Sequence, residues 1–287
     1  MEKKKKKQRG RLAETWHQLK KNKFAIAGLI VVILVLLVAI FAPLLAPYAY
    51  DAQDLANTYA KPSAEHLLGT DKFGRDTLSR LIWGSRNSMK MGLGCVAFGT
   101  IAGLFIGSIA GYFGGAVDNV IMRIMDIFSC VPMMLMCVVI AAILGPSVRN
   151  AIIAIAVSTT PSAARLIRAN ILTVRDKEFV EAAKAIDAKA PHIILKHVLP
   201  NAIAPTIVST TMNIGNSIIQ GATLSFIGLG AQPPLAEWGA MLSEGRNLMR
   251  DHMDLVIYPG ICIMITVLAF NLLGDGLRDA LDPRLRN

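Results

Sequence analysis

Long apolar stretches limit what this chain of 287 residues can fold into more than any other feature. The first stretch, from Phe24 to Tyr50, contains no charged residue. A helix needs about 20 mostly apolar residues to cross roughly 30 Å of hydrocarbon, and its backbone polar groups must pair within the segment. Stretches of that kind predict transmembrane helices over 24–46, 88–111, 118–144, 150–170, 205–229 and 257–275. The sequence therefore predicts an all-α, polytopic membrane protein with six transmembrane helices.

Composition agrees with this class, because 53% of the residues are hydrophobic and only 17% are charged, against about a quarter charged in soluble domains. The first apolar stretch is longer than the roughly 7 to 15 residues of a signal-peptide core. No small-residue cleavage site follows it, so we expect a retained helix. Gly99, Gly103 and Gly107 recur at four-residue spacing, which favours close helix packing in lipid.

Basic residues set the predicted orientation, since short cytoplasmic segments carry an excess of Lys and Arg. They gather in the segment 1–23, between Arg165 and Lys196, and in the tail 278–287. We therefore place both termini and the loop 171–204 in the cytoplasm, and the loops 47–87 and 230–256 outside. The net charge of +10 belongs to these anchors at the lipid surface. The basic opening has no aromatic residue for base stacking, so we expect no nucleic-acid partner.

Nothing in the sequence predicts a metal centre, a cofactor or a catalytic residue in this chain. The cysteines lie in apolar runs without CxxC spacing, which predicts buried small side chains, and the histidines have no metal-ligand spacing. Met133, Met134 and Met136 point around a helix and cannot converge on one ion. The chain also lacks a GxxxxGK[ST] phosphate loop, so we expect no ATPase site of its own.

The cytoplasmic loop 171–204 carries an amphipathic pattern too polar for the bilayer. Phe179, Ala183 and Ile186 recur at helical spacing. A second short helix is predicted to begin near Asp187, as its N-cap, and to end before Pro200. An exposed apolar stripe of this kind needs a partner, and the alternative is a helix resting on lipid headgroups.

This loop resembles the EAA loop of binding-protein-dependent ABC importer permeases of type I. The resemblance rests on Glu181-Ala182-Ala183 and on Leu199-Pro200 at the family's distance. It implies that these residues and Asp187 form coupling helices seated in a groove of the ATP-hydrolysing subunit. The family usually has Gly where this chain has Asp187, and Asp tolerates left-handed backbone better than most residues.

The resemblance extends over most of the chain, to the peptide, nickel and glutathione branch of the family and in particular to the C-type subunit of dipeptide and oligopeptide importers. The segments that carry it are 66–80, 111–115, 237–242 and 271–284. It implies a first helix followed by a permease core over 88–277, in a bacterial cytoplasmic membrane. The implied partners are a homologous second permease, two ATPase subunits that bind ATP and Mg²⁺, and an extracytoplasmic binding protein. Dipeptide, longer peptide, glutathione and nickel chelate all remain open as substrates.

Charges alternate in sign along the predicted outer loop, at Asp71, Arg75, Asp76 and Arg80. One alternative is mutual salt bridging that orders the loop, which contributes little per exposed pair. The other is a docking surface for the extracytoplasmic binding protein. Both alternatives stay open at this point.

Polar residues within predicted membrane helices are costly and therefore informative. In the fifth helix they fall on roughly one face: Asn213, Asn216, Ser217 and Gln220. They could line a passage that hydrogen-bonds peptide backbone, or they could bond neighbouring helices. Arg123 and Asp126 lie one turn apart, which predicts a local ion pair.

Two other classes of function compete with the importer permease. An ion-driven secondary transporter would commonly show internal repeats and ionisable residues near the bilayer midplane. An intramembrane enzyme would need paired His or Asp residues at that depth. Neither signal is clear in this sequence, so we predict a permease subunit without enzyme activity of its own.

Overall fold

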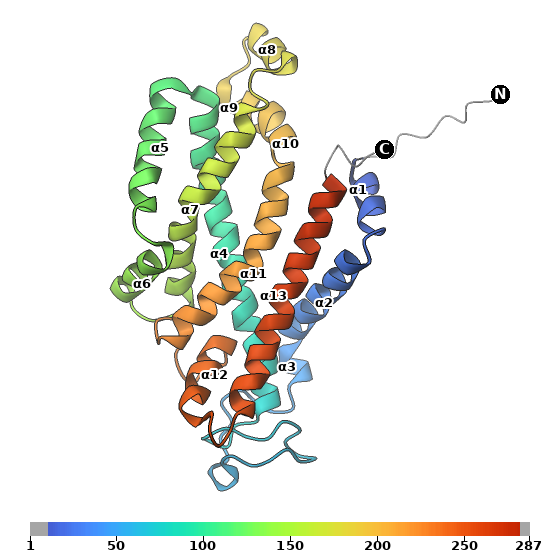
Figure 1. Cartoon of the computed structure of the whole chain (residues 1–287), viewed down its shortest axis with the longest axis vertical. Helices are drawn as coiled ribbons and strands as arrows, with labels where there is room; N and C mark the ends of the chain where they lie inside the picture. Colours follow the sequence, from blue (N-terminus) through green and yellow to red (C-terminus); the bar gives the residue numbers. More distant parts are fainter. Residues whose placement is uncertain (1–10, 282–287) are drawn as a thin grey trace, which may run out of the picture.

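The computed structural model describes residues 11–281, which are largely helical and form no β-strand in that range. Helices long and apolar enough to cross a membrane run along the molecule (Figure 1): α2 Lys23–Ile40, α4 Thr77–Phe113, α7 Val148–Leu172 and α13 Asp254–Leu281. Two further crossings are bent helix pairs. One joins α5 Gly115–Ser129 to α6 Met133–Leu144 at 83°, and the other joins Ala190–Ala202 to α11 Ala204–Phe226 at 67°. The described residues thus hold four membrane-crossing helices, or up to six if each bent pair is one span.

The predicted single helix over 118–144 is wrong, because the structure divides it into α5 and α6. Pro132 stands at the break and acts as the N-cap of α6. The residue before a proline is pushed away from helical backbone, and the proline itself lacks an N–H to continue the ladder. An apolar run alone therefore gave no sign of the bend.

Helix α4 begins at Thr77, well before the predicted start at 88, because Asp76 caps it. The Asp76 Oδ2 atom accepts a hydrogen bond of 2.7 Å from the backbone N–H of Ser79. With 37 residues, α4 is about 55 Å long at 1.5 Å per residue, which exceeds the roughly 30 Å of hydrocarbon. Part of α4 therefore extends beyond the hydrocarbon. In contrast, the helix predicted over 24–46 is shorter than expected, since α2 ends at Ile40 and is followed by the short α3 Ala42–Leu45.

Helices α4 and α7 pack closely through glycines. A Cβ atom on Gly103 would lie 2.6 Å from the Cβ of Ala163, and one on Gly107 would lie 2.5 Å from the carbonyl oxygen of Ala164. These distances leave no room for a side chain. The prediction of close packing at four-residue spacing is confirmed.

Short elements gather at the two ends of the molecule (Figure 1). At one end lie α1 Arg11–Leu19, the C-terminal end of α13, α8 Glu178–Ala185, α9 Ala190–Ile193, the π-helical turn η2 Ile194–Val198 and α10 Leu199–Ala202. At the other end lie η1 Leu55–Asn57, α12 Trp238–Gly245 and η3 Arg246–Leu248. The two sets of loops that the sequence assigns to opposite sides of the membrane are thus at opposite ends of the structure.

Candidate functional site

The segment from α8 to α10 packs one apolar face onto the end of α7. Val180, Ala183, Ile193 and Val198 are buried there together with Ile167 and Ile171 of α7. Burying an aliphatic side chain of this size stabilises the fold by about 1.5–3 kcal/mol. This segment, residues 178–202, is called the coupling segment below, and its inner face is part of the protein core.

The predicted apolar stripe of the coupling segment is wrong in detail, because its members point in different directions. Ala183 is buried, whereas Phe179 is 39% exposed and Ile186 is 80% exposed. Helix α8 ends at Ala185, and the chain turns at Asp187, whose φ of 59° is left-handed. The expectation that Asp187 replaces a glycine in a left-handed turn is confirmed.

The second helix of the segment also differs from the prediction. It starts at Ala190 with Lys189 as the N-cap, so Asp187 does not cap it. It continues through Pro200 to Ala202, rather than ending before the proline. A wider π-helical turn precedes Pro200, and a wider turn of this kind relieves the clash between a proline ring and the preceding carbonyls.

The outer surface of the coupling segment offers apolar and charged groups side by side. Glu181, Ala182 and Pro200 are exposed, and Leu199 is half-buried. Leu195 is 65% exposed and Ile186, as noted, is more so. Large exposed apolar side chains beyond the helix bundle indicate a surface for a partner.

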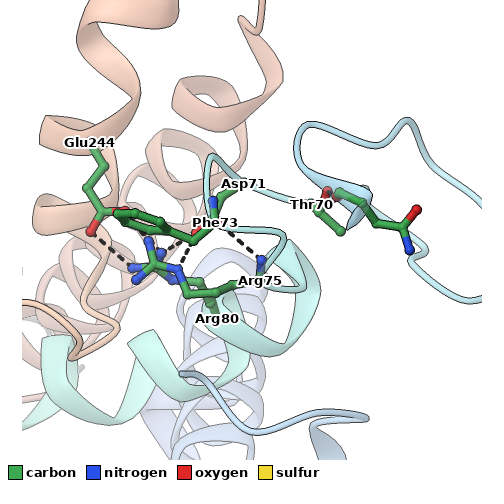
Figure 2. A network of polar contacts seen from close by, with 7 residues as sticks. Thr70, Asp71, Phe73, Arg75, Arg80 and Glu244 are labelled. Atoms are coloured by element: carbon green, nitrogen blue, oxygen red, sulfur yellow. Dashed lines mark hydrogen bonds and ion pairs between the residues drawn. The ribbon is translucent and has the colours of Figure 1, made fainter. Parts of the chain in front are cut away.

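Near the opposite end, charged residues of the outer loop form a buried cluster (Figure 2). Asp71 accepts hydrogen bonds from the guanidinium groups of Arg75, at 2.6 Å, and of Arg80. Glu244 of α12 accepts from the same two groups, at 2.7 Å from Arg75 and 3.0 Å from Arg80. Arg75 and Arg80 are 1% and 2% exposed. We call these four residues the outer ion cluster, and it ties the loop to α12.

Asp76, the fourth predicted docking residue, is also buried at 3% exposure. Besides capping α4, its Oδ1 atom lies 3.0 Å from Nδ1 of His66. The charges that the sequence offered as a docking surface are therefore turned inward, and direct contact through them would require the loop to open. Mutual ion pairing, the other alternative, is what the structure contains. The exposed carboxylate of the same loop, Asp54, has its pKa lowered chiefly by the side-chain hydrogen bond from Asn57.

The polar residues predicted on the fifth helix come together at a hollow between α4, α7 and α11. This hollow has a volume of about 620 Å³ and is lined by all four of them, Asn213, Asn216, Ser217 and Gln220. Thr100, Thr159 and Ser162 add further neutral polar groups from the other two helices. The Oε1 atom of Gln220 is buried without a hydrogen-bond partner, and Asn213 donates only a long bond of 3.5 Å to Ser209. These side chains thus form few hydrogen bonds to neighbouring helices, which was the alternative interpretation.

A second hollow, of about 740 Å³, continues toward the coupling segment, since Asn201 of α10 lines it. It shares Leu166, Ser209, Asn213 and Asn216 with the first. Arg278 supplies a charge to its lining. We call the two hollows together the α11 groove, and its walls combine amide, hydroxyl and apolar groups with the one charge of Arg278.

Sequence reasoning missed several residues that need a distant partner to be recognised. Glu244 completes the outer ion cluster from a position 164 residues after Arg80. Glu237 is 1% exposed, caps α12 and accepts a hydrogen bond of 2.8 Å from Ser88 of α4. The predicted Arg123–Asp126 pair is wrong, since Asp126 lies 3.6 Å from Arg165 of α7. An i to i+3 spacing could not reveal that a neighbouring helix offers the closer partner.

Comparison with known proteins defines the class to which this fold belongs. Residues 103–287 match the family model "Binding-protein-dependent transport system inner membrane component", and residues 10–62 match "N-terminal TM domain of oligopeptide transport permease C". The chain belongs to this family of inner membrane components, and it is a multi-pass permease subunit of a binding-protein-dependent ABC importer.

Curated relatives narrow the class. The chain is 47% identical to the dipeptide transport system permease protein of Alkalihalophilus pseudofirmus, covering 96% of this chain and 90% of the relative. It is 44% identical to a probable D,D-dipeptide transport system permease protein of Escherichia coli, with 93% and 89% covered. A glutathione transport system permease protein of Pectobacterium atrosepticum is 41% identical, with 96% and 91% covered.

Solved structures share the fold at low sequence identity. The MetNI methionine ABC transporter, in an inward-facing conformation, gives a TM-score of 0.59 at 18% identity over 71% of this chain and 96% of that one. An amino acid ABC transporter gives 0.54 at 18%, over 69% and 92%. The predicted type I ABC importer permease fold is thereby confirmed.

Proposed function

We propose that this subunit forms half of a translocation pathway for di- or oligopeptides, with the α11 groove as its share of the pathway. The observation that carries the proposal is the gathering of Asn213, Asn216, Ser217 and Gln220 on one hollow rather than on helix contacts. Similarity to dipeptide permeases over nearly the whole chain supports the substrate class.

The chemistry of the groove suits a peptide in transit. Amide and hydroxyl groups can donate to and accept from a peptide backbone, whatever the side chains of that peptide. Gln220 Oε1 is buried and lacks a partner, so its side chain would have to turn into the hollow to accept from a substrate N–H group. Neutral groups bind weakly enough to release the substrate, whereas a fixed carboxylate would hold a cation in place.

The coupling segment would pass motion from an ATPase to the groove through α7. Its inner face packs on Ile167 and Ile171, and the neighbouring Ala163 and Leu166 of α7 line the groove. Packed helices move as units rather than deforming continuously. A shift of α8 against the ATPase therefore displaces one wall of the pathway.

The remaining assembly follows from the family resemblance. A homologous second permease would cover the open side of the groove, two ATPase subunits would bind ATP and Mg²⁺ and receive the coupling segments, and an extracytoplasmic binding protein would deliver substrate at the end that carries α12. The Lys and Arg bias supports a cytoplasmic position for both termini, and the bacterial membrane is what the family resemblance implies. Glutathione is a second candidate substrate, because a glutathione permease is 41% identical.

The test is uptake of a radiolabelled dipeptide into proteoliposomes that hold the whole importer, with ATP on the ATPase side and the binding protein on the other. We expect ATP-dependent uptake that excess dipeptide competes away and excess glutathione does not. Competition by glutathione but not by unlabelled dipeptide would identify glutathione, rather than a dipeptide, as the substrate. Uptake that persists without ATP would overturn both and favour an ion-driven transporter.

The role of the groove is tested separately with single cysteines at Asn213 and Asn216, in a background that lacks the four native cysteines. We expect a small thiol reagent to block uptake at both positions, and excess substrate to slow the reaction. Ser63→Cys, in the exposed outer loop, is the matched control and should react without loss of uptake. Equal uptake after complete modification of both groove cysteines would exclude the groove as the pathway.

A further inference from the structure

A basic patch at the junction of α1 and α2 plays no part in the proposed transport. Lys20, Lys21 and Lys23 follow one another there, and all three are exposed. The described residues pair none of them with a carboxylate in a salt bridge. Such a cluster directly beside a membrane-spanning helix is typical of contact with anionic lipid.

The patch borders a hollow of about 530 Å³ between this junction and the end of α13. Lys21 and Lys23 line it together with Asp279, so its lining carries two positive charges and one negative, a net charge of +1. The Asp279 carboxylate is held by a 3.4 Å hydrogen bond from Asn22, and Asn22 also caps α2. We call this shallow, net-positive hollow the basic recess.

Aromatic and apolar side chains continue from the recess toward the hydrocarbon. Phe24 lines the recess and is 73% exposed, while Ile30 and Leu34 further along α2 are more than half exposed, at 52% and 54%. On α1, Trp16 is 46% exposed, with the Lys20 ammonium 5.1 Å from the centre of its ring. Aromatic rings beside lysines mark the level of lipid headgroups.

We propose that this recess binds the headgroup of an anionic phospholipid. In this proposal Lys21 and Lys23 bind the phosphate, and Lys20 attracts it from beside the recess. The acyl chains lie along the exposed face of α2. The occupant is a lipid rather than a free anion because the cationic recess opens directly onto apolar surface.

The test measures the phospholipid that remains on the purified full-length protein after a mild detergent wash of vesicles containing equal phosphatidylglycerol and phosphatidylcholine. The variant Lys20→Gln/Lys21→Gln/Lys23→Gln removes the patch. The matched control, Lys61→Gln/Arg149→Gln/Arg250→Gln, removes the same charge from exposed positions at the other end. A third variant, Lys21→Arg/Lys23→Arg, keeps the charge. Thermal unfolding of each variant reports whether it is folded.

We expect the wild-type protein to retain phosphatidylglycerol over phosphatidylcholine, the preference of the patch variant to fall roughly 100-fold, and the control and Arg variants to keep it. Equal retention by folded patch variant and wild type would overturn the proposal. So would a preference that soluble phosphate or glycerol phosphate abolishes, since the recess would then be a simple anion site. If the patch variant does not fold, the lipid preference of Lys23→Gln alone decides between the same outcomes.

Discussion

The outer ion cluster and the coupling segment both appear in the sequence as charged stretches beside membrane helices, yet their architecture is opposite. In the outer ion cluster, charges are buried and neutralise one another: two guanidinium groups meet the carboxylates of Asp71 and Glu244. In the coupling segment, Glu181 and its charged neighbours are exposed, and so are the apolar Ile186 and Leu195.

The difference shows whether the groups that each region contacts lie within this chain or on another surface. Buried charge is costly unless it is paired, so the outer ion cluster is complete within this chain and fixes the loop on α12. Exposed aliphatic side chains gain free energy only when another surface covers them. The coupling segment is therefore incomplete by itself, whereas the outer ion cluster is complete.

The largest expected effect comes from breaking the outer ion cluster. Arg75→Met leaves buried carboxylate charge only partly paired, and loss of one partner from a buried pair costs about 3–5 kcal/mol. We expect a clear fall in the thermal unfolding midpoint of the purified protein. The neighbouring Lys72 is exposed, so Lys72→Met should leave the midpoint nearly unchanged. Similar midpoints for both variants would show that the cluster does not hold the loop.

Substitutions on the outer surface of the coupling segment are expected to change the stability of the subunit little and its assembly with the ATPase strongly. Ile186→Asp and Leu195→Asp each remove an exposed apolar contact worth about 1.5–3 kcal/mol when covered. We expect roughly 10- to 100-fold weaker association with the ATPase subunit, measured by co-purification, at an unchanged unfolding midpoint. Leu67→Asp, equally exposed at the opposite end, serves as the control. Undiminished association of both variants would mean that the partner covers another surface.

Substitutions at Asp187 distinguish an effect of its left-handed backbone from an effect of its side-chain contacts. Asp187→Gly removes the cost of left-handed backbone and should preserve ATP-driven uptake, whereas Asp187→Val should destabilise the turn by about 1–2 kcal/mol. Limited proteolysis of the coupling segment measures the difference, with Lys189→Val, at an ordinary φ of -65°, as the control. Equal cleavage of the Gly and Val variants would exclude strain at this position.

The smallest effect concerns Asp54, the exposed counterpart of the buried carboxylates. Its pKa lies below the ordinary value of 3.8, chiefly because Asn57 donates to the ionised form. The contribution of this bond is present above the ordinary pKa and is lost as pH falls through the lowered one. Asn57→Ala should raise the pKa, as measured by NMR titration of Asp54. An unchanged titration curve would contradict the assigned cause.

The sequence by itself determined the class of this protein. Six apolar stretches, the basic segments between them and the small residues that allow close packing of α4 could be read from it, because hydropathy, charge bias and residue spacing act within short windows. The polar residues of α11 could be placed on one face for the same reason, since helical periodicity is local. The left-handed turn at Asp187 was indicated only by the family resemblance, since local propensity predicted a helix N-cap there.

Tertiary structure decided what those local signals left open. Whether Arg75 faces solvent or a carboxylate depends on Glu244, which reaches it from 169 residues away. The partner of Asp126 is likewise on another helix. The groove exists only where α4, α7 and α11 meet. Ion pairs between distant segments and cavities are properties of side chains brought together by folding, so no short window along the chain contains them.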